Sequence, residues 1–300
     1  MHALFVGVDA GGSHTIAALA RGDELLRTIA GPAANPNLIG IGAAAETLER
    51  CIARVLEGES PAAIAVGVAG AGDESIAAHL RAALTRSFPN ARIVLCHDAR
   101  IALRAALPEG DGLVLIAGTG SIAYAEIGDE TSRAGGYGYL LGDKGSGYAV
   151  GAAALRHLLT ETELGSGENA MLAELAAHLG ANDRPRILAR IYQSATPVAD
   201  IAACAPLVLR HAARGEQLSV GIVEHAAQSL FELIARITLR HPKPALPVVF
   251  SGGLLRQGNA LTQQLEQRIA GASLDVRVLA ARVEPCIGAL HEARRLMATS

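Results

Sequence analysis

One short unit occurs twice in this 300-residue chain, and it constrains the fold more than any other feature. Near the N-terminus an apolar run ends in Asp9-Ala10-Gly11-Gly12-Ser13, and a second apolar run follows it. Further along, the apolar run Leu113-Val114-Leu115-Ile116-Ala117 leads into Gly118-Thr119-Gly120-Ser121 and then into another apolar run. A repeated unit of strand, glycine-hydroxyl turn and strand predicts two related domains that face each other.

The patterns around each copy predict alternating strands and helices. Three strands joined by hairpin-like turns come first, and helices and strands then alternate, which indicates a mixed sheet with helices packed on it. After the second copy a mostly helical region precedes a return of the α/β pattern. We therefore predict an α/β protein with an N-terminal domain at 1–110 and a C-terminal domain at 111–300, which carries a helical insertion at about 150–245. The expected strands are 4–8, 15–21, 24–30, 64–68, 93–95, 113–117, 122–127, 248–250 and 276–279, and the expected helices are 43–56, 74–87, 101–107, 218–239, 260–269 and one from about 287.

Composition and charge argue against several classes of partner. Only 18% of the residues are charged, the net charge is −3, and the basic residues are scattered, so a nucleic acid partner is not expected. The N-terminus has no basic leader, and the most apolar later run, 62–71, is too short to cross a bilayer. We expect a cytoplasmic protein without a membrane partner. The four cysteines are far apart and form no C-x-x-C pair, so neither a zinc site nor a disulfide framework is expected.

Both glycine turns have the chemistry of an anion site. Glycines let backbone N–H groups approach an anion without a Cβ in the way, and hydroxyls add further donors. Asp9 at the strand tip would face the same anion, which makes sense only with a metal ion or its water between them. Taken alone, the first turn is explained equally well as a hairpin with a polar tip. The prediction of phosphate binding therefore depends on the pair of turns, neither of which is a Walker or dinucleotide-binding motif.

Three further stretches carry candidate functional residues. Asp98 precedes a helix, where capping of backbone donors is favoured over the alternative of a general base. The stretch from Gly135 to Gly147 holds six glycines in thirteen residues, which is costly in chain entropy for a core element and favours a ligand-lining loop. Ser251-Gly252-Gly253 follows an apolar strand and could lie against a flat ligand, although a simple strand-to-helix turn is favoured for it on its own.

Together these stretches resemble the N-acetylglucosamine kinase and BadF/BadG/BcrA/BcrD ATPase family, within the superfamily of sugar kinases, heat-shock chaperones and actin. The resemblance covers nearly the whole chain, and the order and separation of the motifs agree with it. It implies two ribonuclease H-like, actin-like ATPase domains with ATP and substrate in the cleft between them. It also implies a kinase that uses ATP and Mg²⁺ to phosphorylate an alcohol group of an amino sugar. The motifs that carry the resemblance are Gly7-Val8-Asp9-Ala10-Gly11-Gly12-Ser13, Ala117-Gly118-Thr119-Gly120-Ser121 and Gly136-Tyr137-Gly138-Tyr139-Leu140-Leu141-Gly142-Asp143-Lys144-Gly145-Ser146.

The resemblance also implies a role for individual residues. Asp98 matches the family's catalytic base, which changes its preferred interpretation from cap to base, and Asp9 would position Mg²⁺ through water. The implied ATP-binding residues are Gly11, Gly12, Ser13 and Thr15 in the first phosphate loop, Gly118, Thr119 and Gly120 in the second, Gly252 and Gly253 in the adenosine loop, and Ala203 in the helical insertion. The implied sugar-binding residues are Asn35, Asp98, Ser121, Gly136, Tyr137, Gly138 and Asp143.

Two positions depart from the family pattern. Such kinases commonly have tryptophan where this chain has Tyr137, and an acid where this chain has Lys144. A base beside the sugar site makes an anionic substituent conceivable, as in N-acetylmuramic acid, while a Lys144 side chain that points to solvent is an equally good interpretation. The acceptor thus stays open among N-acetylglucosamine, glucosamine and N-acetylmuramic acid, with the 6-hydroxyl as the expected position.

Other function classes fit the sequence less well. Activator ATPases of dehydratases or reductases in the same family carry an iron–sulfur cluster on clustered cysteines, and no pair here has cluster-like spacing. A sugar-sensing regulator would place a helix-turn-helix before the kinase domains, whereas this sequence begins with its first strand. A purely structural protein would leave the paired glycine turns without a purpose. A homodimer stays open, because relatives of this family are often dimers.

Overall fold

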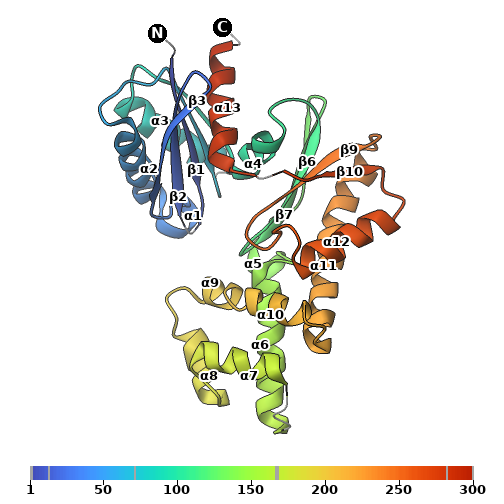
Figure 1. Cartoon of the computed structure of the whole chain (residues 1–300). Helices are drawn as coiled ribbons and strands as arrows, with labels where there is room; N and C mark the ends of the chain where they lie inside the picture. Colours follow the sequence, from blue (N-terminus) through green and yellow to red (C-terminus); the bar gives the residue numbers. More distant parts are fainter. Residues whose placement is uncertain (1–2, 13, 71, 166–168, 282, 299–300) are drawn as a thin grey trace. The chain divides into compact units, whose positions relative to one another are not determined.

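The strands of this protein form two five-stranded sheets (Figure 1). The structure is a computed structural model that describes residues 3–12, 14–70, 72–165, 169–281 and 283–298. The chain divides into unit 1, which holds residues 1–110 and 281–300, and unit 2, which holds residues 111–280. Each unit contains one of the sheets. Every helix in the described ranges is too short or too polar to cross a membrane.

Unit 1 is built on a mixed sheet in the order β3-β2-β1-β4-β5. The β1-β2 and β2-β3 pairs are antiparallel, while β4 and β5 run parallel to β1, so β1, β4 and β5 end at the same edge of the sheet. Apolar residues of β1 alternate between the two faces: Val6 and Val8 pack with helices α2 and α3, and Phe5 packs with α4 and α13. The bounds are β1 Leu4–Ala10, β2 Thr15–Arg21, β3 Glu24–Gly31, α1 Pro36–Ile39, α2 Ile41–Leu56, β4 Ala63–Val68, α3 Glu74–Ser87, β5 Arg92–His97, α4 Asp98–Ala106 and α13 Pro285–Ala298.

The last helix, α13, belongs to unit 1 although it follows unit 2 in the sequence. Two glycines allow its close packing. A Cβ at Gly7 of β1 would lie 2.4 Å from the Cys286 carbonyl oxygen, and a Cβ at Gly288 would lie 1.8 Å from the Ile101 carbonyl oxygen of α4. The predicted boundaries, 1–110 and 111–300, therefore differ from the observed units at residues 281–300, because this helix covers the first sheet.

Unit 2 repeats the sheet of unit 1. Its order is β10-β9-β6-β7-β8, with antiparallel β6-β7 and β7-β8 pairs and with β9 and β10 parallel to β6. β6 thus corresponds to β1, and the predicted α/β class with two related sheets is confirmed. The sequence patterns do not predict β8, because its residues are mostly polar. The bounds are β6 Gly112–Ala117, β7 Ser121–Ile127, β8 Glu130–Gly135, β9 Leu246–Ser251, α12 Ala260–Gly271 and β10 Val276–Leu279.

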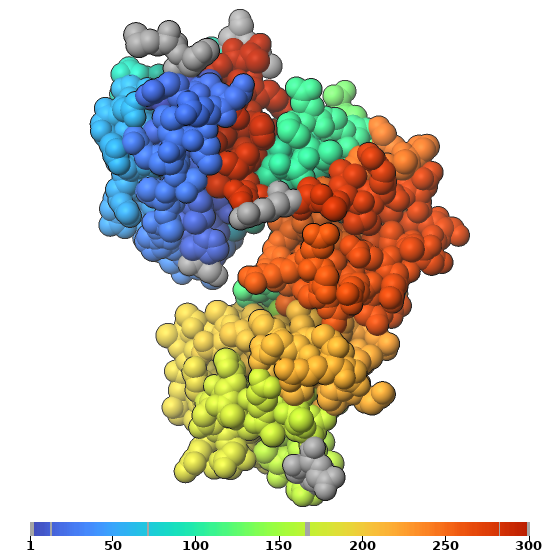
Figure 2. Space-filling model, viewed as in Figure 1, coloured from blue at the N-terminus to red at the C-terminus, as the bar shows by residue number. Residues whose placement is uncertain are grey.

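The helical segment of unit 2 lies between β8 and β9 in the chain, close to where the insertion is predicted. Its first long helix, α6, begins after Ser146, whose Oγ accepts a hydrogen bond from the Ala149 N–H at 3.2 Å. The longest helix, α11, buries an apolar stripe that includes Ile222, Leu230 and Ile234 in the core of unit 2. In Figure 2 the atoms of residues 147–202, coloured yellow-green and yellow, gather at one end of unit 2, apart from the orange-red atoms of residues 246–279. The bounds are α5 Gly138–Leu141, α6 Gly147–Leu164, α7 Ala170–Leu179, α8 Arg184–Tyr192, α9 Pro197–Ala202, α10 Ala205–Ala212 and α11 Gln217–Arg240.

Candidate functional site

Two carboxylates of unit 1 lie at the edge where its parallel strands end. Asp9 is near the end of β1, and Asp98 follows β5 as the first residue of α4. Strand β4 lies between β1 and β5, since Asp9 pairs with Gly67 and Gly67 pairs with Cys96. Two strand spacings amount to roughly 10 Å. Ligands of open α/β sheets bind at this edge, so the predicted metal-positioning and base residues lie at the expected place of unit 1.

The Asp9 carboxyl is half-buried, and its surroundings make its ionisation costly. Burial, and to a smaller extent the negative charge of Asp98, raise the pKa of Asp9 to about 7. A nearby cation would offset both effects, because it favours the charged form of the carboxyl. Oxygen ligands of this kind suit Mg²⁺, which usually keeps several of its waters. The residues present therefore fit a Mg²⁺ ion that Asp9 positions through water.

We expect Asp9→Asn to stabilise the metal-free protein at pH 8 more than at pH 4. The pKa of Asp9 is about 7 in the folded chain, and that of an unperturbed aspartate is about 3.9. Above pH 7 folding of the wild type must bury a charged carboxylate. Below about pH 4 this carboxyl is neutral in both the folded and the unfolded chain, so the stability difference between the wild type and Asp9→Asn disappears. The gain in the free energy of unfolding at pH 8 is about 2–4 kcal/mol. Urea unfolding in the presence of EDTA, repeated from pH 4 to pH 8, measures it.

The matched control is Asp23→Asn, because Asp23 is in the same unit with a fully exposed side chain. It is expected to change stability by less than about 0.5 kcal/mol at every pH. Added Mg²⁺ should reduce the difference in free energy of unfolding between the wild type and Asp9→Asn at pH 8. A gain for Asp9→Asn that is as large at pH 4 as at pH 8 would contradict the buried-charge explanation.

Asp98 combines a capping contact with an accessible carboxylate. Its Oδ1 accepts a hydrogen bond from the Ala99 N–H at 2.9 Å, and about 30% of its side chain is exposed. The Nδ1 of His97 lies 2.7 Å from the same oxygen. The two interpretations of Asp98 from the sequence are therefore compatible in the structure: one oxygen serves the helix N-terminus, and the carboxylate remains open to a ligand.

The first glycine turn is tied to the loop that follows β3. Gly11 donates its N–H to the His14 carbonyl oxygen at 3.0 Å and accepts one from Ala34 at 3.2 Å. The Thr15 hydroxyl is fully buried and donates to the Pro32 carbonyl oxygen at 2.7 Å. This hydroxyl stabilises the hairpin through that bond, and the role of Thr15 in ATP binding stays a prediction. Ser13 lies outside the described residues.

Asn35 lies beside the first glycine turn. Its Oδ1 caps the short helix α1 by accepting the Asn37 N–H at 2.9 Å, and its Nδ2 is 3.8 Å from the position that a Cβ at Gly12 would take. Asn37 in turn donates to the Gly70 carbonyl oxygen at 3.2 Å. The cap fixes the direction of the Asn35 amide, so the structure brings this predicted sugar-binding residue next to the predicted phosphate loop of unit 1.

In unit 2 the second glycine turn is joined to the glycine-rich loop. Gly147 donates its N–H to the Gly118 carbonyl oxygen at 2.7 Å, and the Ser121 hydroxyl donates to the Lys144 carbonyl oxygen at 2.8 Å. The Ser121 N–H donates to Asp143 Oδ1 at 3.2 Å. A Cβ at Gly120 would lie only 2.8 Å from Asp143 Oδ2, so a side chain at this position would displace the Asp143 carboxylate. The predicted phosphate loop and the predicted sugar-binding Asp143 thus form one cluster.

The glycine-rich loop itself presents polar groups from unusual backbone conformations. Gly136, Gly138 and Asp143 have positive φ, which glycine adopts readily and aspartate only occasionally. Burial raises the pKa of Asp143, and the hydrogen bond from the Ser121 N–H opposes this shift. Tyr137 is exposed over more than half of its surface. The loop therefore offers the partly buried Asp143 carboxyl and an accessible Tyr137 ring to a ligand.

The predicted adenosine loop lies beside the end of β6. β9 pairs in parallel with β6, and the Leu254 N–H donates to the Ala117 carbonyl oxygen at 3.1 Å. Gly252 has φ +93° and approaches Ala117 closely, whereas a Cβ at Gly253 would meet nothing within 4 Å. In the helical segment, Ala203 follows Ala202. The Cβ of Ala202 is 3.5 Å from the position that a Cβ at Gly147 would take. All the predicted ATP-binding stretches of unit 2 therefore lie around the end of β6.

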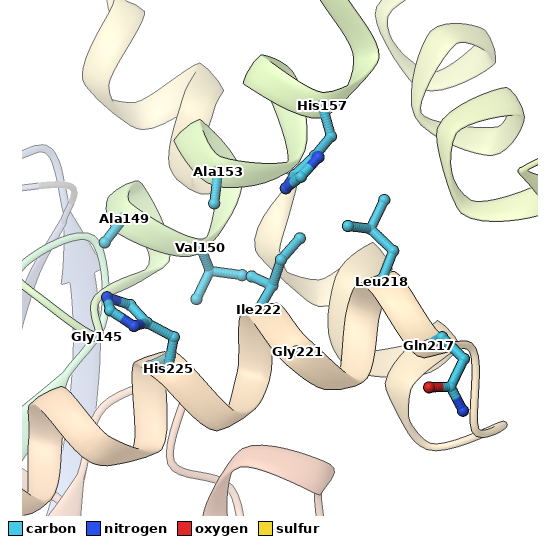
Figure 3. Close-up of a pocket in the computed structure, with 11 residues that line it drawn as sticks. Gly145, Ala149, Val150, Ala153, His157, Gln217, Leu218, Gly221, Ile222 and His225 are labelled. Carbon is cyan, nitrogen blue, oxygen red and sulfur yellow. The ribbon is translucent and has the colours of Figure 1, made fainter. Parts of the chain in front are cut away.

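A separate groove of about 370 Å³ lies between α6 and α11 (Figure 3). The close-up shows His157 from α6 and His225 from α11 with their rings toward the space between the helices. Apart from Gln217 the other lining residues are small or apolar, and of the predicted loops only Gly145 borders the groove. This groove contains none of the predicted ATP- or sugar-binding residues.

Comparison with known proteins identifies the family of this chain. A model of the BadF/BadG/BcrA/BcrD ATPase family matches residues 6–293. The chain belongs to this family. One relative of this BadF/BadG-type chain is the N-acetylmuramic acid/N-acetylglucosamine kinase of Clostridium acetobutylicum. The two sequences are 26% identical over an alignment that covers 96% of this chain and 97% of the relative. The N-acetyl-D-glucosamine kinase of Dictyostelium discoideum is 25% identical over 95% of the chain and 96% of the relative.

Solved structures share the fold of this family member over nearly their full lengths. A proposed N-acetylglucosamine kinase from Chromobacterium violaceum superposes with a TM-score of 0.80 at 25% identity, covering 96% of this chain and 98% of that one. A ROK family glucokinase from Streptomyces griseus, in complex with glucose and AMPPNP, superposes with a TM-score of 0.63 at 18% identity, covering 97% and 99%. The predicted actin-like ATPase and sugar kinase fold is confirmed.

One residue beside the predicted base is not singled out by the sequence patterns. His97 ends β5, and its ring touches the Asp98 carboxylate. Histidine at a helix N-cap is not by itself a functional signal. The one sequence signal that could have drawn attention to His97 is its position directly before a candidate base at the end of strand β5.

Proposed function

We propose that this BadF/BadG-type protein is an ATP-dependent sugar kinase that phosphorylates an amino sugar, N-acetylglucosamine or glucosamine, at its 6-hydroxyl. The observation that carries the proposal is the placement of Asp98. It stands at the end of a parallel strand, on the sheet edge that also carries the half-buried Asp9, with one oxygen held by a backbone amide and the carboxylate open to solvent. The kinase names of the two curated relatives support the same reaction class.

In the proposed reaction Asp98 accepts the proton of the sugar hydroxyl as the hydroxyl oxygen attacks the γ-phosphorus of ATP. Phosphoryl transfer needs mainly positioning and charge stabilisation, so most of the remaining residues bind and orient the two substrates. When bound, Mg²⁺ would neutralise part of the negative charge of the phosphates. Asp9 would hold this ion through water, because a nearby cation favours the ionised form of a carboxyl whose pKa is raised.

Each unit supplies part of the binding groups in this proposal. In unit 1, the turn at Gly11 and Gly12 binds phosphate oxygens through backbone amides, and Asn35 donates to a sugar hydroxyl. In unit 2, phosphate binding falls to Gly118, Thr119 and Gly120, adenosine binding to Gly252, Gly253 and Ala203, and sugar binding to Ser121, Gly136, Tyr137, Gly138 and Asp143. The hydrogen bond from Ser121 to Asp143 would couple the phosphate and sugar groups of unit 2.

An ATP-consumption assay across a panel of hexoses and amino sugars tests the proposal. N-acetylglucosamine or glucosamine should stimulate ADP formation, and nuclear magnetic resonance of the product should place the new phosphate on the 6-oxygen. The absence of stimulation by every sugar would reject the kinase activity. Iron in the purified protein would instead indicate an activator ATPase with a metal cluster.

Lys144 provides a test of the acceptor within the same proposal. Its side chain is exposed and its carbonyl oxygen is bonded to Ser121, next to the predicted sugar-binding Asp143. We expect Lys144→Glu to lower kcat/KM for N-acetylmuramic acid about fivefold more than for N-acetylglucosamine, because an exposed charge contributes modestly. Lys144→Gln, which removes the charge without reversing it, should give a smaller change. Equal effects on both sugars would mean that Lys144 points to solvent.

We also propose that the enzyme acts in the cytoplasm, where ATP is supplied, and that it forms a homodimer. Light scattering of the purified protein measures the mass in solution. A mass of one chain, 30.8 kDa, would reject the dimer without affecting the proposed reaction.

A further inference from the structure

We infer that Tyr148 is a positioning residue for the sugar-binding loop, because its ring holds helix α5 against the start of helix α6. The inference rests on the proposed function, since α5 lies within the loop that carries predicted sugar-binding residues. Tyr148 is the second residue of α6, and Tyr139 is the second residue of α5. Their ring centroids are 5.2 Å apart, and their planes are tilted by 60°.

Helix α5 is not held in place by a hydrophobic core. It is four residues long, and none of these described residues is buried. Its end is closed by a local hydrogen bond, from the Gly142 N–H to the Gly138 carbonyl oxygen at 2.8 Å. Leu140 and Leu141 are each exposed over more than three quarters of their surface. A single helical turn without a buried face is unstable by itself, so the position of α5 depends on the contact that the Tyr139 ring makes.

The backbone of Tyr148 is fixed, because α6 begins on the predicted phosphate loop of unit 2. The Gly147 N–H donates to the Gly118 carbonyl oxygen at 2.7 Å, and the Tyr148 N–H donates to the Thr119 carbonyl oxygen at 3.2 Å. Both bonds come from backbone groups, so they persist when the Tyr148 side chain is changed. The Tyr148 ring therefore connects α5 to a segment that the phosphate loop already holds.

The two rings meet in a geometry that stabilises aromatic pairs. Tilted rings at this separation place the positive edge of one ring toward the negative face of the other. The predicted sugar-binding Tyr137 and Gly138 stand directly before Tyr139, and Asp143 comes two residues after α5 ends. Loss of the ring contact would let these groups move apart. The apparent affinity for the sugar would then fall in proportion to the fraction of molecules that keep the loop in its binding arrangement.

The test replaces each ring and measures KM for the sugar. We expect Tyr148→Leu and Tyr139→Leu each to raise KM for N-acetylglucosamine about 2- to 12-fold, the range that an aromatic pair contributes, with KM for ATP changed less than about twofold. Tyr148→Phe keeps the ring and should recover most of the lost affinity. The double Leu variant should raise KM no further than either single variant, because both changes break the same contact. Tyr192→Leu is the matched control, since Tyr192 lies on α8 of the same unit with 81% of its surface exposed, and KM should not change.

Hydrogen exchange reads the contact without any assay of activity. The backbone amides of residues 137–142 should exchange faster in Tyr148→Leu than in the wild type, Tyr148→Phe and Tyr192→Leu. Equal exchange in the wild type and Tyr148→Leu would overturn the inference. So would an active wild type whose Tyr148→Leu variant keeps its KM for the sugar, or a double variant in which the two single effects multiply. A wild type with no sugar-dependent ATP consumption would reject the proposed function and, with it, the sugar-binding part of the inference, whereas the exchange measurement still tests the ring contact.

Discussion

Replacing Asp98 by Asn is expected to lower sugar-dependent ATP turnover about 10²- to 10⁴-fold, the range that general base catalysis contributes. The Asn side chain is nearly the same size, and its oxygen can still accept the Ala99 N–H that now binds Oδ1. It cannot take a proton from the attacking hydroxyl, because an amide oxygen is a very weak base. The measurement is kcat at saturating ATP and sugar, with a thermal unfolding curve for each protein.

The matched control for this substitution is Asp73→Asn. Asp73 also accepts a backbone N–H at a helix start in unit 1, from Ser75 at 2.8 Å. Aspartate and asparagine cap helices almost equally well, so turnover should stay within about twofold of the wild type. Near wild-type turnover in a folded Asp98→Asn variant would show that Asp98 is not the base.

Gly252→Ala is expected to destabilise unit 2 by about 3 kcal/mol and to weaken ATP binding strongly. The backbone at Gly252 has φ +93°, a conformation that costs an L-residue about 1–2 kcal/mol. In addition, the new Cβ would lie 2.3 Å from the Ala117 carbonyl oxygen. That oxygen belongs to the backbone of the buried strand β6 and cannot move aside as a flexible side chain would, so overpacking adds about 1–3 kcal/mol. Urea unfolding and calorimetric titration with ATP measure the two effects.

The neighbouring glycine provides the control. A Cβ at Gly253 would meet nothing within 4 Å, so Gly253→Ala should change stability by less than about 0.5 kcal/mol. A folded Gly253→Ala variant with weaker ATP binding would support backbone contact with the nucleotide at this turn. Equal loss of stability in both variants would contradict the close approach of Gly252 to β6.

Local patterns predict most of the elements of this fold. β2 and β10 have the predicted bounds, 15–21 and 276–279, and α11 differs from its prediction by one residue at each end. Asp73 caps α3 as expected, through its contact with the Ser75 N–H. These features depend on side-chain alternation, helical periodicity and capping groups, all of which act between residues no more than about four positions apart. The polar strand β8 has no apolar alternation, and α1, although Asn35 caps it, is too short at four residues to show helical periodicity, so the sequence analysis does not predict either.

The sequence predicts the residues of the candidate site better than it predicts the contacts between them. The sequence places the two glycine turns, the candidate phosphate-binding loops, directly after apolar strands. In the structure these turns follow the ends of β1 and β6. The hydrogen bonds from Ser121 to Asp143 and Lys144 join residues more than twenty positions apart. They depend on how β7, β8 and the glycine-rich loop fold back on the second turn, which no local pattern records.

The sequence by itself determined the two related strand-turn-strand units and the positions of Asp9 and Asp98 at strand ends, because short-range alternation and turn chemistry encode them. Only the tertiary structure decided that α13 completes unit 1, that the Thr15 hydroxyl donates to Pro32, and that Ser121 contacts Asp143 and Lys144. Close packing at Gly7 and Gly288 and the direction of single hydroxyl and ring groups depend on segments distant in the chain. Such contacts exist only once the sheets and helices have assembled.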